Sequence, residues 1–312
     1  MAHLTRHAHE LLARQHGVAS TQQLLDTGLS ARQLRHLQQS QDLELVLRGA
    51  YRTPSAPDSE LARCAAVCAA RSDVAIAGPT AGRLWGFRRL PSDHRIHVLA
   101  PPASNPAIAR WVVPFRTGAR HDHDVVERDD GIRITTRART AYDLARWLGP
   151  DDLLSVIEQA AHDGRLDDGD FLDVAGDWLS PRRPWAREFL QALDRRLPGG
   201  PAESHPEVRV AEALSRAGVR GLVRQHGIRL PGHGDVRFDL AVPELRWAIE
   251  IDLHPSHRET LGIASDARRD RAAGAIGWMT SRVSDVQYQE QFNETIAELA
   301  ATHAALRRRL AG

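Results

Sequence analysis

The chain has 312 residues and an apolar fraction of 42%, enough to bury the cores of two or three soluble domains. Its 41 basic residues, all arginine, and its 40 acidic residues leave a formal net charge of +1. A genome rich in arginine codons accounts for this bias, but no lysine is available as a catalytic acid, base or electrophile. The chain has no signal-peptide core and nothing near the roughly 20 apolar residues that span a bilayer, so we expect a cytoplasmic protein without a membrane partner.

The first domain is expected over residues 1–57 and has the pattern of a winged helix-turn-helix. Ser20 with Gln23, and Ser30 with Gln33, have the spacing of two capping boxes, each opening a short helix. The apolar segment LELVLRGAYRTP follows these helices and has the composition of β-structure. Two short helices joined by a glycine-containing turn and followed by a β-segment are typical of this DNA-binding motif.

The second of these short helices is predicted to bury Ala31, Leu34 and Leu37. Its outward-facing side chains are then Arg32, Gln33, Arg35, His36 and Gln39. These residue types suit phosphate contact and base-edge reading, so DNA is the expected partner. A solvated helix face that binds only protein is the alternative, and the docking geometry of the motif favours DNA by about two to one.

Two cysteines occur in the chain, both in the alanine-rich run DSELARCAAVCAARS, which is predicted to be a helix capped by Asp58 or Ser59. Cys64 and Cys68 are four residues apart, and no second Cys or His pair is spaced to complete a tetrahedral metal site. Buried thiols are therefore expected. The run His-Asp-His-Asp at 121–124 is predicted to be a solvated turn, because adjacent loop side chains seldom converge on a metal.

The order GVASTQQLLDTGLSARQLRHLQQSQDLELVLRGAYRTP, continued by PTAGRLWGF, RIHVLAP and RITTRARTAYDLAR, resembles AbiEi-type antitoxins over roughly residues 5–195. The resemblance implies a winged helix followed by a mixed α/β domain, placed at 58–200, in a repressor that binds the DNA of its own toxin–antitoxin operon. These are packing motifs, so they support the fold better than the activity. Winged-helix repressors commonly pair, and a homodimer would present two half-sites, although the sequence leaves the oligomeric state open.

Acidic and imidazole side chains concentrate in FDLAVPELRWAIEIDLHPSH, residues 238–257. Alternating apolar residues predict two strands joined by a turn at Pro243-Glu244-Leu245. Residue numbers that face each other then sum to about 489, which sets Asp239 opposite Glu250 with Cβ atoms roughly 5 Å apart. Asp252 shares the face of Glu250. Three repelling carboxylates need a cation or a proton between them, and a hard divalent ion is the natural partner.

A third domain is expected over 201–312, after the breaker sequence Leu-Pro-Gly-Gly-Pro. Its predicted α-β-β-β-α-β-α order resembles the PD-(D/E)XK restriction-endonuclease-like core, which makes the fold class of the chain α/β, of the mixed α+β kind. The helix start ES..E, the pair FDLA…IEID, the following histidines and the helix motif D..RD are similar to a domain related to very-short-patch-repair endonucleases. This likeness covers about residues 203–287.

The endonuclease resemblance implies that Asp239, Glu250 and the Ile251 carbonyl hold Mg²⁺ or Mn²⁺ against a phosphate oxygen. The implied activity is metal-dependent hydrolysis of phosphodiester bonds in DNA, in repair or defence. Glu207 matches a helix acid that assists metal binding through water in many such nucleases. A capping box with Ser204 explains Glu207 equally well without any chemistry.

The chain departs from the family pattern just after the second acid. Asp252 stands where a lysine is expected, and Leu253 replaces a glycine common in this branch. The family's two histidines fall on His254 and His257, which become the candidates to accept or deliver the proton. Arg269 on the next helix would neutralise phosphate charge, or would instead form a salt bridge with an aspartate of its own helix.

Three alternatives to a nuclease stay open. The nuclease fold would serve as an inactive scaffold in a DNA-binding repressor or antitoxin, which the missing lysine favours. Asp252, His254 and His257 would instead form a facial Zn²⁺ or Mn²⁺ site of another hydrolase. The acids would otherwise be structural and stabilised by Arg237 and Arg246. Strandedness and sequence specificity of a cut are not determined by the sequence.

Overall fold

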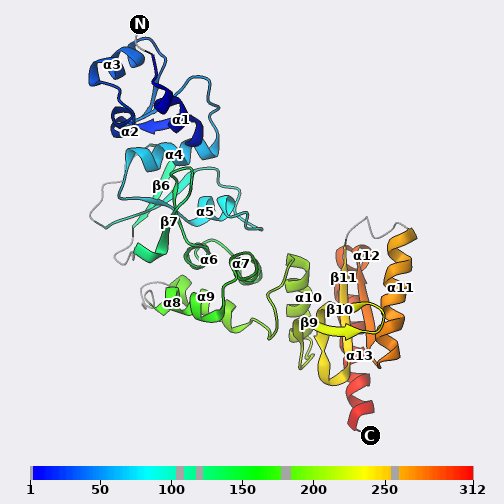
Figure 1. The fold of residues 1–312 in the computed structure, drawn as a ribbon. Helices are drawn as coiled ribbons and strands as arrows, with labels where there is room; N and C mark the ends of the chain where they lie inside the picture. Colours follow the sequence, from blue (N-terminus) through cyan, green and yellow to red (C-terminus); the bar gives the residue numbers. More distant parts are fainter. Residues whose placement is uncertain (1–2, 103–108, 117–121, 177–183, 254–259, 312) are drawn as a thin grey trace. The chain divides into compact units, whose positions relative to one another are not determined.

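The computed structural model describes residues 3–102, 109–116, 122–176, 184–253 and 260–311 (Figure 1). Within these ranges the protein is a mixed α/β structure with three separate sheets, which confirms the expected fold class. None of the described helices is both long and apolar enough to cross a membrane.

The chain divides into two compact units, each built from segments that are separated in sequence. Unit 1 comprises Met1–Leu148 and Asp170–Ala186, and unit 2 comprises Gly149–Gly169 and Arg187–Gly312. Helix α7 (Pro150–Gly164) is part of unit 2, together with the C-terminal sheet. The three-domain division expected from the sequence stays a prediction.

The N-terminal segment of unit 1 is a winged helix whose three strands form an antiparallel sheet in the order β1-β3-β2. Both predicted capping boxes are present, at Ser20 with Gln23 and at Ser30 with Gln33. Gly49 closes the turn between β2 and β3 with a φ of +89°, a conformation that glycine adopts without strain. In chain order the elements are α1 (Arg6–Arg14), β1 (Val18–Ser20), α2 (Thr21–Asp26), α3 (Ala31–Gln39), β2 (Glu44–Leu47) and β3 (Ala50–Arg52).

The winged helix and the following region share one hydrophobic core. Helix α4 (Glu60–Ala70) packs against β1 and β3, so that Val18 and Ala50 of the wing sheet contact the same cluster as Ile76 and Ile134. Cys64 and Cys68 on α4 are buried free thiols, which confirms the structural role expected of them. The wing sheet thus rests on α4 and is not an isolated element.

The middle part of unit 1 is a five-stranded mixed sheet in the order β6-β5-β4-β8-β7. The segments RIHVLAP and RITTRARTAYDLAR contain the strands β5 and β8. The described elements are β4 (Ala75–Ile76), α5 (Gly78–Leu84), β5 (Ile96–Ala100), β6 (Val112–Arg116), η1 (Asp122–Asp124), β7 (Val125–Glu127), β8 (Arg133–Thr135) and α6 (Arg137–Leu144). Helices α8 (Asp168–Gly176) and α9 (Pro184–Asp194) follow α7 in the chain.

Unit 2 contains a four-stranded sheet in the order β12-β11-β10-β9. The strands β9, β10 and β11 are antiparallel neighbours, whereas β11 and β12 are parallel and joined through α11, which confirms the predicted element order. The elements are α10 (His205–Arg216), β9 (Val223–Leu230), β10 (Gly234–Val242), η2 (Pro243–Leu245), β11 (Trp247–Asp252), α11 (Thr260–Ala275), β12 (Met279–Ser284), α12 (Asp285–Gln289) and α13 (Phe292–Ala311).

The two faces of this sheet carry separate hydrophobic clusters. Leu240 and Trp247 pack with residues of α10 and α13, whereas Phe238 packs with Ala248 and with Ala273 of α11. Figure 1 shows α10 and α11 on opposite sides of the strands. The alternating apolar pattern of the sequence predicts one common face for Val236, Phe238, Leu240 and Val242. This prediction is wrong, because Phe238 and Leu240 pack into separate clusters.

Candidate functional site

Helix α3 presents a polar face to solvent and an apolar face to the core of the winged helix. Leu34 and Leu37 are buried, as expected. Ala31 is exposed, so its predicted inward position is wrong; it is the first residue of the helix, where the chain has only begun to turn toward the core. The exposed side chains, which we call the α3 face, are Arg32, Gln33, Arg35, His36 and Gln39.

Members of the α3 face differ in how free their side chains are to reach DNA. The Gln33 carboxamide oxygen accepts hydrogen bonds from the Ser30 N–H and the Ser30 hydroxyl, both at 2.8 Å. This cap occupies the group that would read a base. The Arg35 Nε donates to the Ala31 carbonyl at 3.3 Å, which leaves its terminal guanidinium nitrogens for other partners.

The β2–β3 hairpin, which we call the wing, adds a basic residue that was not predicted from the sequence. Arg48 lies in the turn between β2 and β3 and is exposed. The apolar composition of LELVLRGAYRTP predicts a single β-segment, whereas the structure has a turn at Arg48-Gly49. A glycine after an arginine between two apolar runs is the signal that would have located it.

The second candidate site lies on the β10–β11 hairpin of unit 2. Its register pairs Leu240 with Ile249 and Val242 with Trp247, so that facing residue numbers sum to 489, as predicted. The turn is the 3-10 segment Pro243–Leu245, also as predicted. The paired register ends at Leu240 and Ile249, one residue before Asp239 and Glu250.

The acid pair, defined as Asp239 and Glu250, is held in a largely buried setting. Glu250 is 5% exposed, and the Asp239 Oδ2 accepts a hydrogen bond from the Ile251 N–H at 2.9 Å. The two carboxyls are close enough for one, when protonated, to donate to the other. Burial, and then the charge of Asp239, raises the pKa of Glu250 to about 8, and burial also raises the pKa of Asp239.

The backbone around Asp239 is irregular. The β9–β10 register skips one pair of residues between Phe238–His226 and Leu240–Arg224. Gln225, which lies in this gap, has a φ of +49°, in the left-handed region. Its side-chain amide donates to Glu207 at 2.8 Å. An irregularity that redirects a side chain beside an acid is a common device next to functional sites.

Arginines contact two of the three predicted acids. Arg269 of α11 donates to Glu250 at 2.5 Å and to the Arg237 carbonyl at 2.8 Å. Arg282 of β12 donates to Asp252, and it pairs with Asp270 at 2.9 Å. Arg269 thus forms a bridge to Glu250. Of the two aspartates of α11 expected as alternative partners, Asp270 pairs with Arg282, and the side chain of Asp266 lies outside the described residues.

Arg282 was missed at the sequence level. It aligns with Glu250 in the parallel β11–β12 register, which sequence alternation alone does not reveal. Burial opposes its charge, but the hydrogen bonds to Asp270 and Asp252 outweigh that effect and raise the pKa of Arg282 above its ordinary value. Arg282 thus neutralises Asp252 as a fixed cation and does not exchange protons.

Glu207 at the start of α10 is a third buried acid on this side of the sheet, 6% exposed. Its carboxylate accepts hydrogen bonds from the Ser204 hydroxyl at 2.6 Å and from the Glu203 N–H at 3.0 Å. The predicted capping box is present in part. The Ser204 hydroxyl accepts from the Glu207 N–H, but the backbone N–H that donates to the Glu207 carboxylate is that of Glu203 and not of Ser204. Burial raises the pKa of Glu207, and the charge of Asp239 contributes to that rise.

The acid pair provides carboxylate oxygens, which are the ligands that hard divalent ions prefer. It offers carboxylate oxygens that burial and mutual repulsion make costly to ionise without a cation. Across the described residues, however, no group of three or more His, Cys, Asp or Glu side chains could hold a metal ion. His254 and His257 lie outside the described residues, and so does most of the facial Zn²⁺ site expected with Asp252.

Arg237 and Arg246, the arginines expected to stabilise the acids if these are purely structural, contact other groups. Arg237 pairs with Glu203, and Arg246 donates to the Ile276 carbonyl at 3.2 Å. The arginines that stabilise the acids are thus Arg269 and Arg282, from α11 and β12, and not the two residues of the hairpin itself.

The described geometry defines a winged-helix protein with an added α/β unit that contains a buried acid pair. Residues 9–54 match the family model described as transcriptional regulator, AbiEi antitoxin. The chain therefore carries an AbiEi antitoxin-like transcriptional-regulator domain at its N-terminus, as predicted. The match covers the winged helix alone.

A comparison with solved structures finds a distant likeness to the Rv2827c protein from Mycobacterium tuberculosis. The sequences are 17% identical, the likeness covers 66% of this chain and 80% of that chain, and the TM-score is 0.39. The comparison with curated proteins gives no significant match.

Proposed function

We propose that this chain is a DNA-binding transcriptional regulator that recognises its own toxin–antitoxin operon through the α3 face and the wing. The observation that carries the proposal is the exposed polar face of α3, anchored by Leu34 and Leu37 inside the segment that matches the regulator family. A homodimer would place two copies of α3 on two half-sites of such an operator.

The side chains of this surface suit different tasks. Arg35 and Gln39 are one helical turn apart and exposed, so both would follow the same groove and meet base edges. Arg48 on the wing suits a backbone phosphate, which fixes position without reading sequence. Gln33 would support the N-terminus of α3, since its carboxamide oxygen is engaged by Ser30.

Fluorescence anisotropy with the chain's own promoter fragment and a scrambled fragment tests this proposal. Arg35→Ala is expected to weaken promoter binding by about tenfold, equivalent to about 1–3 kcal/mol for a base contact, and to bring the two fragments closer in affinity. Arg6→Ala is the matched control, because Arg6 on α1 is exposed and lies outside the α3 face. Equal affinity of the wild type for both fragments would show that the chain is not a sequence-specific regulator.

The acid pair favours a second function, metal-dependent hydrolysis of phosphodiester bonds in DNA by unit 2. We propose that Asp239, Glu250 and the Ile251 carbonyl hold Mg²⁺ or Mn²⁺, with Zn²⁺ as the alternative ion. When bound, such an ion neutralises phosphate charge and lowers the pKa of an attacking water. Arg269, which contacts Glu250 at 2.5 Å, opposes the rise in the pKa of that carboxyl and would lie near the phosphate.

Proton transfer in this second function would fall to histidine. The described basic residues that contact the hairpin acids, Arg269 and Arg282, are both arginines. Arginine does not titrate in the working range of an enzyme. His254 or His257 would therefore accept or deliver the proton. If neither histidine does so, unit 2 would be a catalytically inactive scaffold in a DNA-binding regulator.

Cleavage assays with Mn²⁺ on single- and double-stranded DNA separate these outcomes. Asp239→Asn and Glu250→Gln are expected to lower cleavage by at least about a hundredfold if the pair holds the ion. Asp235→Asn is the matched control, since Asp235 lies exposed on the same strand. Equal cleavage by all variants would exclude the assignment, and cleavage by none, including wild type, would leave the regulator function alone.

A further inference from the structure

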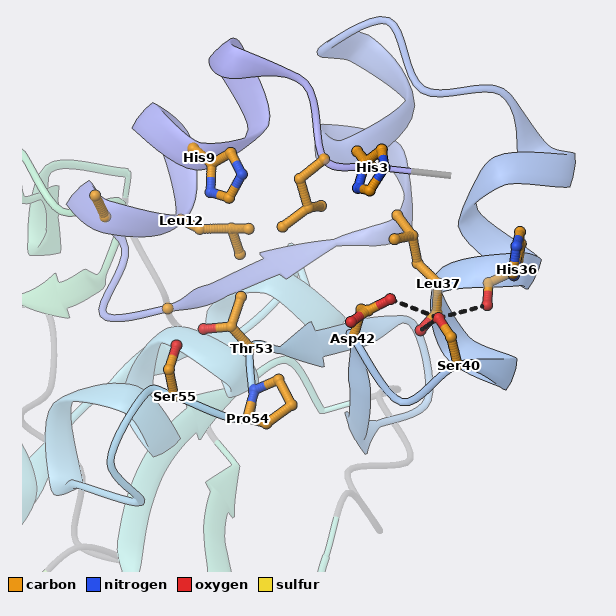
Figure 2. Close-up of a pocket in the computed structure, with 13 residues that line it drawn as sticks. His3, His9, Leu12, His36, Leu37, Ser40, Asp42, Thr53, Pro54 and Ser55 are labelled. Atoms are coloured by element: carbon orange, nitrogen blue, oxygen red, sulfur yellow. Dashed lines mark hydrogen bonds between the residues drawn. The ribbon is translucent and has the colours of Figure 1, made fainter. Parts of the chain in front are cut away.

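An open cavity of about 740 Å³ lies on the surface of the winged helix, where most of its lining residues are exposed (Figure 2). Ligand-binding cavities in proteins usually measure about 300–1,000 Å³. Its walls come from α1, from the C-terminal half of α3, and from the segment after β3. The cavity is separate from the acid pair, which belongs to unit 2.

The backbone around the cavity is held by hydrogen bonds within the domain. The Gly17 carbonyl accepts from the Thr53 N–H at 3.0 Å, and Ala56 donates to the Thr53 carbonyl at 3.0 Å. Gly17 has a φ of +79°, and a Cβ there would lie 2.2 Å from the Ala56 Cβ. Glycine is needed for this close approach, which fixes the segment after β3 against the end of α1.

The cavity lining combines apolar walls with imidazoles. Leu4, Leu12, Ala13, Leu37 and Pro54 provide apolar surface, while His3, His9 and His36 add ring nitrogens. Figure 2 shows His3 and His9 on the α1 side and His36 on the α3 side. Thr53 and Ser55 supply hydroxyl groups, and the one acid, Asp42, accepts a hydrogen bond from the Ser40 hydroxyl at 2.6 Å.

This lining selects among classes of ligand. Within the described part of the chain no group of three or more His, Cys, Asp or Glu could hold a metal ion, so three histidines do not make a metal site here. No arginine lines the cavity, which is unlike a site for DNA phosphates. Imidazoles and hydroxyls above apolar walls suit a small organic molecule with an apolar body and an acceptor-rich acidic end.

We propose that the cavity binds a small aromatic or aliphatic carboxylate and that its occupancy weakens DNA binding. The connection to DNA is His36, which lines the cavity and also belongs to the α3 face. A ligand that engages His36 and packs on Leu37 occupies a side chain that the proposed DNA contact also uses. Binding of ligand and of DNA then oppose each other by the same factor in both directions. The coupling between ligand and DNA rests on the proposed DNA binding, whereas the ligand site itself does not.

Isothermal titration of the full chain with 2-naphthoate and with its neutral analogue 2-naphthamide tests the ligand class. The carboxylate is expected to bind at least about tenfold more tightly than the amide. Equal affinity for the two compounds, or binding of neither, would overturn the proposed carboxylate site. No DNA is present in this measurement, so its result is independent of the regulator proposal.

Paired substitutions on α1 locate the binding. His9→Gln is expected to weaken 2-naphthoate binding, while His7→Gln leaves it unchanged, because His7 is exposed on the same helix but outside the lining. Ala13→Trp should fill the cavity and abolish binding, with His7→Trp as its control. Ser55→Trp fills it from the opposite wall if Ala13→Trp does not fold. Binding that survives these filled variants would place the ligand elsewhere and refute the site.

Promoter-binding anisotropy in the presence of saturating 2-naphthoate tests the coupling. The wild-type affinity for promoter DNA is expected to fall, and the Ser55→Trp variant should keep its affinity whether or not the compound is present. An unchanged wild-type affinity at saturation would overturn the coupling while leaving the ligand site standing. A wild type that binds no promoter at all would count against the regulator proposal and the coupling together.

Discussion

The winged helix and the acid hairpin use charge in opposite ways. On α3 the arginines are exposed, and the apolar side chains beneath them fix the helix. On the hairpin Glu250 is buried and pairs with Arg269, and half-buried Asp252 pairs with Arg282. An exposed arginine gains little from internal pairing and is available to phosphates outside. A buried acid must be paired, protonated or bound to a cation.

The difference teaches where substitutions should act. Charges of the winged helix should affect affinity for DNA with little effect on folding, whereas charges of unit 2 should affect folding strongly. The four predictions below test that contrast.

Glu158→Ala in α7 is expected to have the largest effect. Glu158 is fully buried and pairs with Arg196 at 3.0 Å and with buried Arg224, and it accepts from the Ala202 N–H at 3.1 Å. Its removal leaves Arg224 buried without this partner, so the free energy of unfolding should fall by about 3–5 kcal/mol. Urea unfolding measures this. The control Asp163→Ala, at an exposed site on the same helix, should lose less than about 1 kcal/mol.

The acid pair should make the metal-free protein sensitive to alkaline pH. Because the folded-state pKa of Glu250 is raised to about 8, its stabilising contribution is full below its ordinary range near 4.5 and is lost as pH rises through 8. The Tm should fall by roughly 5 °C between pH 5.5 and 8.5 through this group. Glu250→Gln should flatten that slope, as followed by thermal unfolding in EDTA. A variant slope equal to that of the wild type would contradict the burial argument.

Ser30→Ala tests the N-terminus of α3. The Ser30 hydroxyl caps the helix by accepting from the Gln33 N–H at 3.2 Å, and loss of such a cap costs about 1 kcal/mol. We expect this decrease in unfolding free energy together with weaker promoter binding, since the α3 face would fray. Ser40→Ala, at the other end of the helix, is the comparison, and an equal loss in both would argue against a specific cap effect.

Arg48→Ala should have the smallest effect. An exposed wing arginine that contacts a phosphate contributes equally on any sequence, so promoter and scrambled fragments should weaken together by a few-fold. The slope of log affinity against log salt concentration should decrease by about one. Thermal unfolding should be unchanged, and a loss confined to the promoter fragment would instead make Arg48 a base reader.

Much of the local architecture could be predicted from the sequence because local signals determine it. The capping boxes depend on residues three positions apart, and the hairpin register follows from one turn and the alternation of its strands. The match of residues 9–54 to the regulator family likewise bears out a resemblance that rested on short packing motifs.

The charge partners could not be predicted in this way. Arg269 and Glu250 are 19 residues apart, and Arg282 and Asp252 are 30 apart. Their pairing depends on how α11 crosses over to bring β12 parallel to β11, and no local pattern sets that register. The bridge between Glu158 and Arg224 spans a still longer separation and crosses what the sequence presents as a breaker region.

The core shared by the wing sheet and α4 determines how much of the chain must accompany the winged helix in a fusion protein. Val18 and Ala50 pack in the same cluster as Ile76 and Ile134, so a cut after residue 57 would strip one wall from the wing and expose it to water. A reporter fusion or chimeric transcription factor should therefore take the middle sheet along with the helices that precede it. The segment that can be transferred to another protein is therefore larger than the winged helix-turn-helix motif itself.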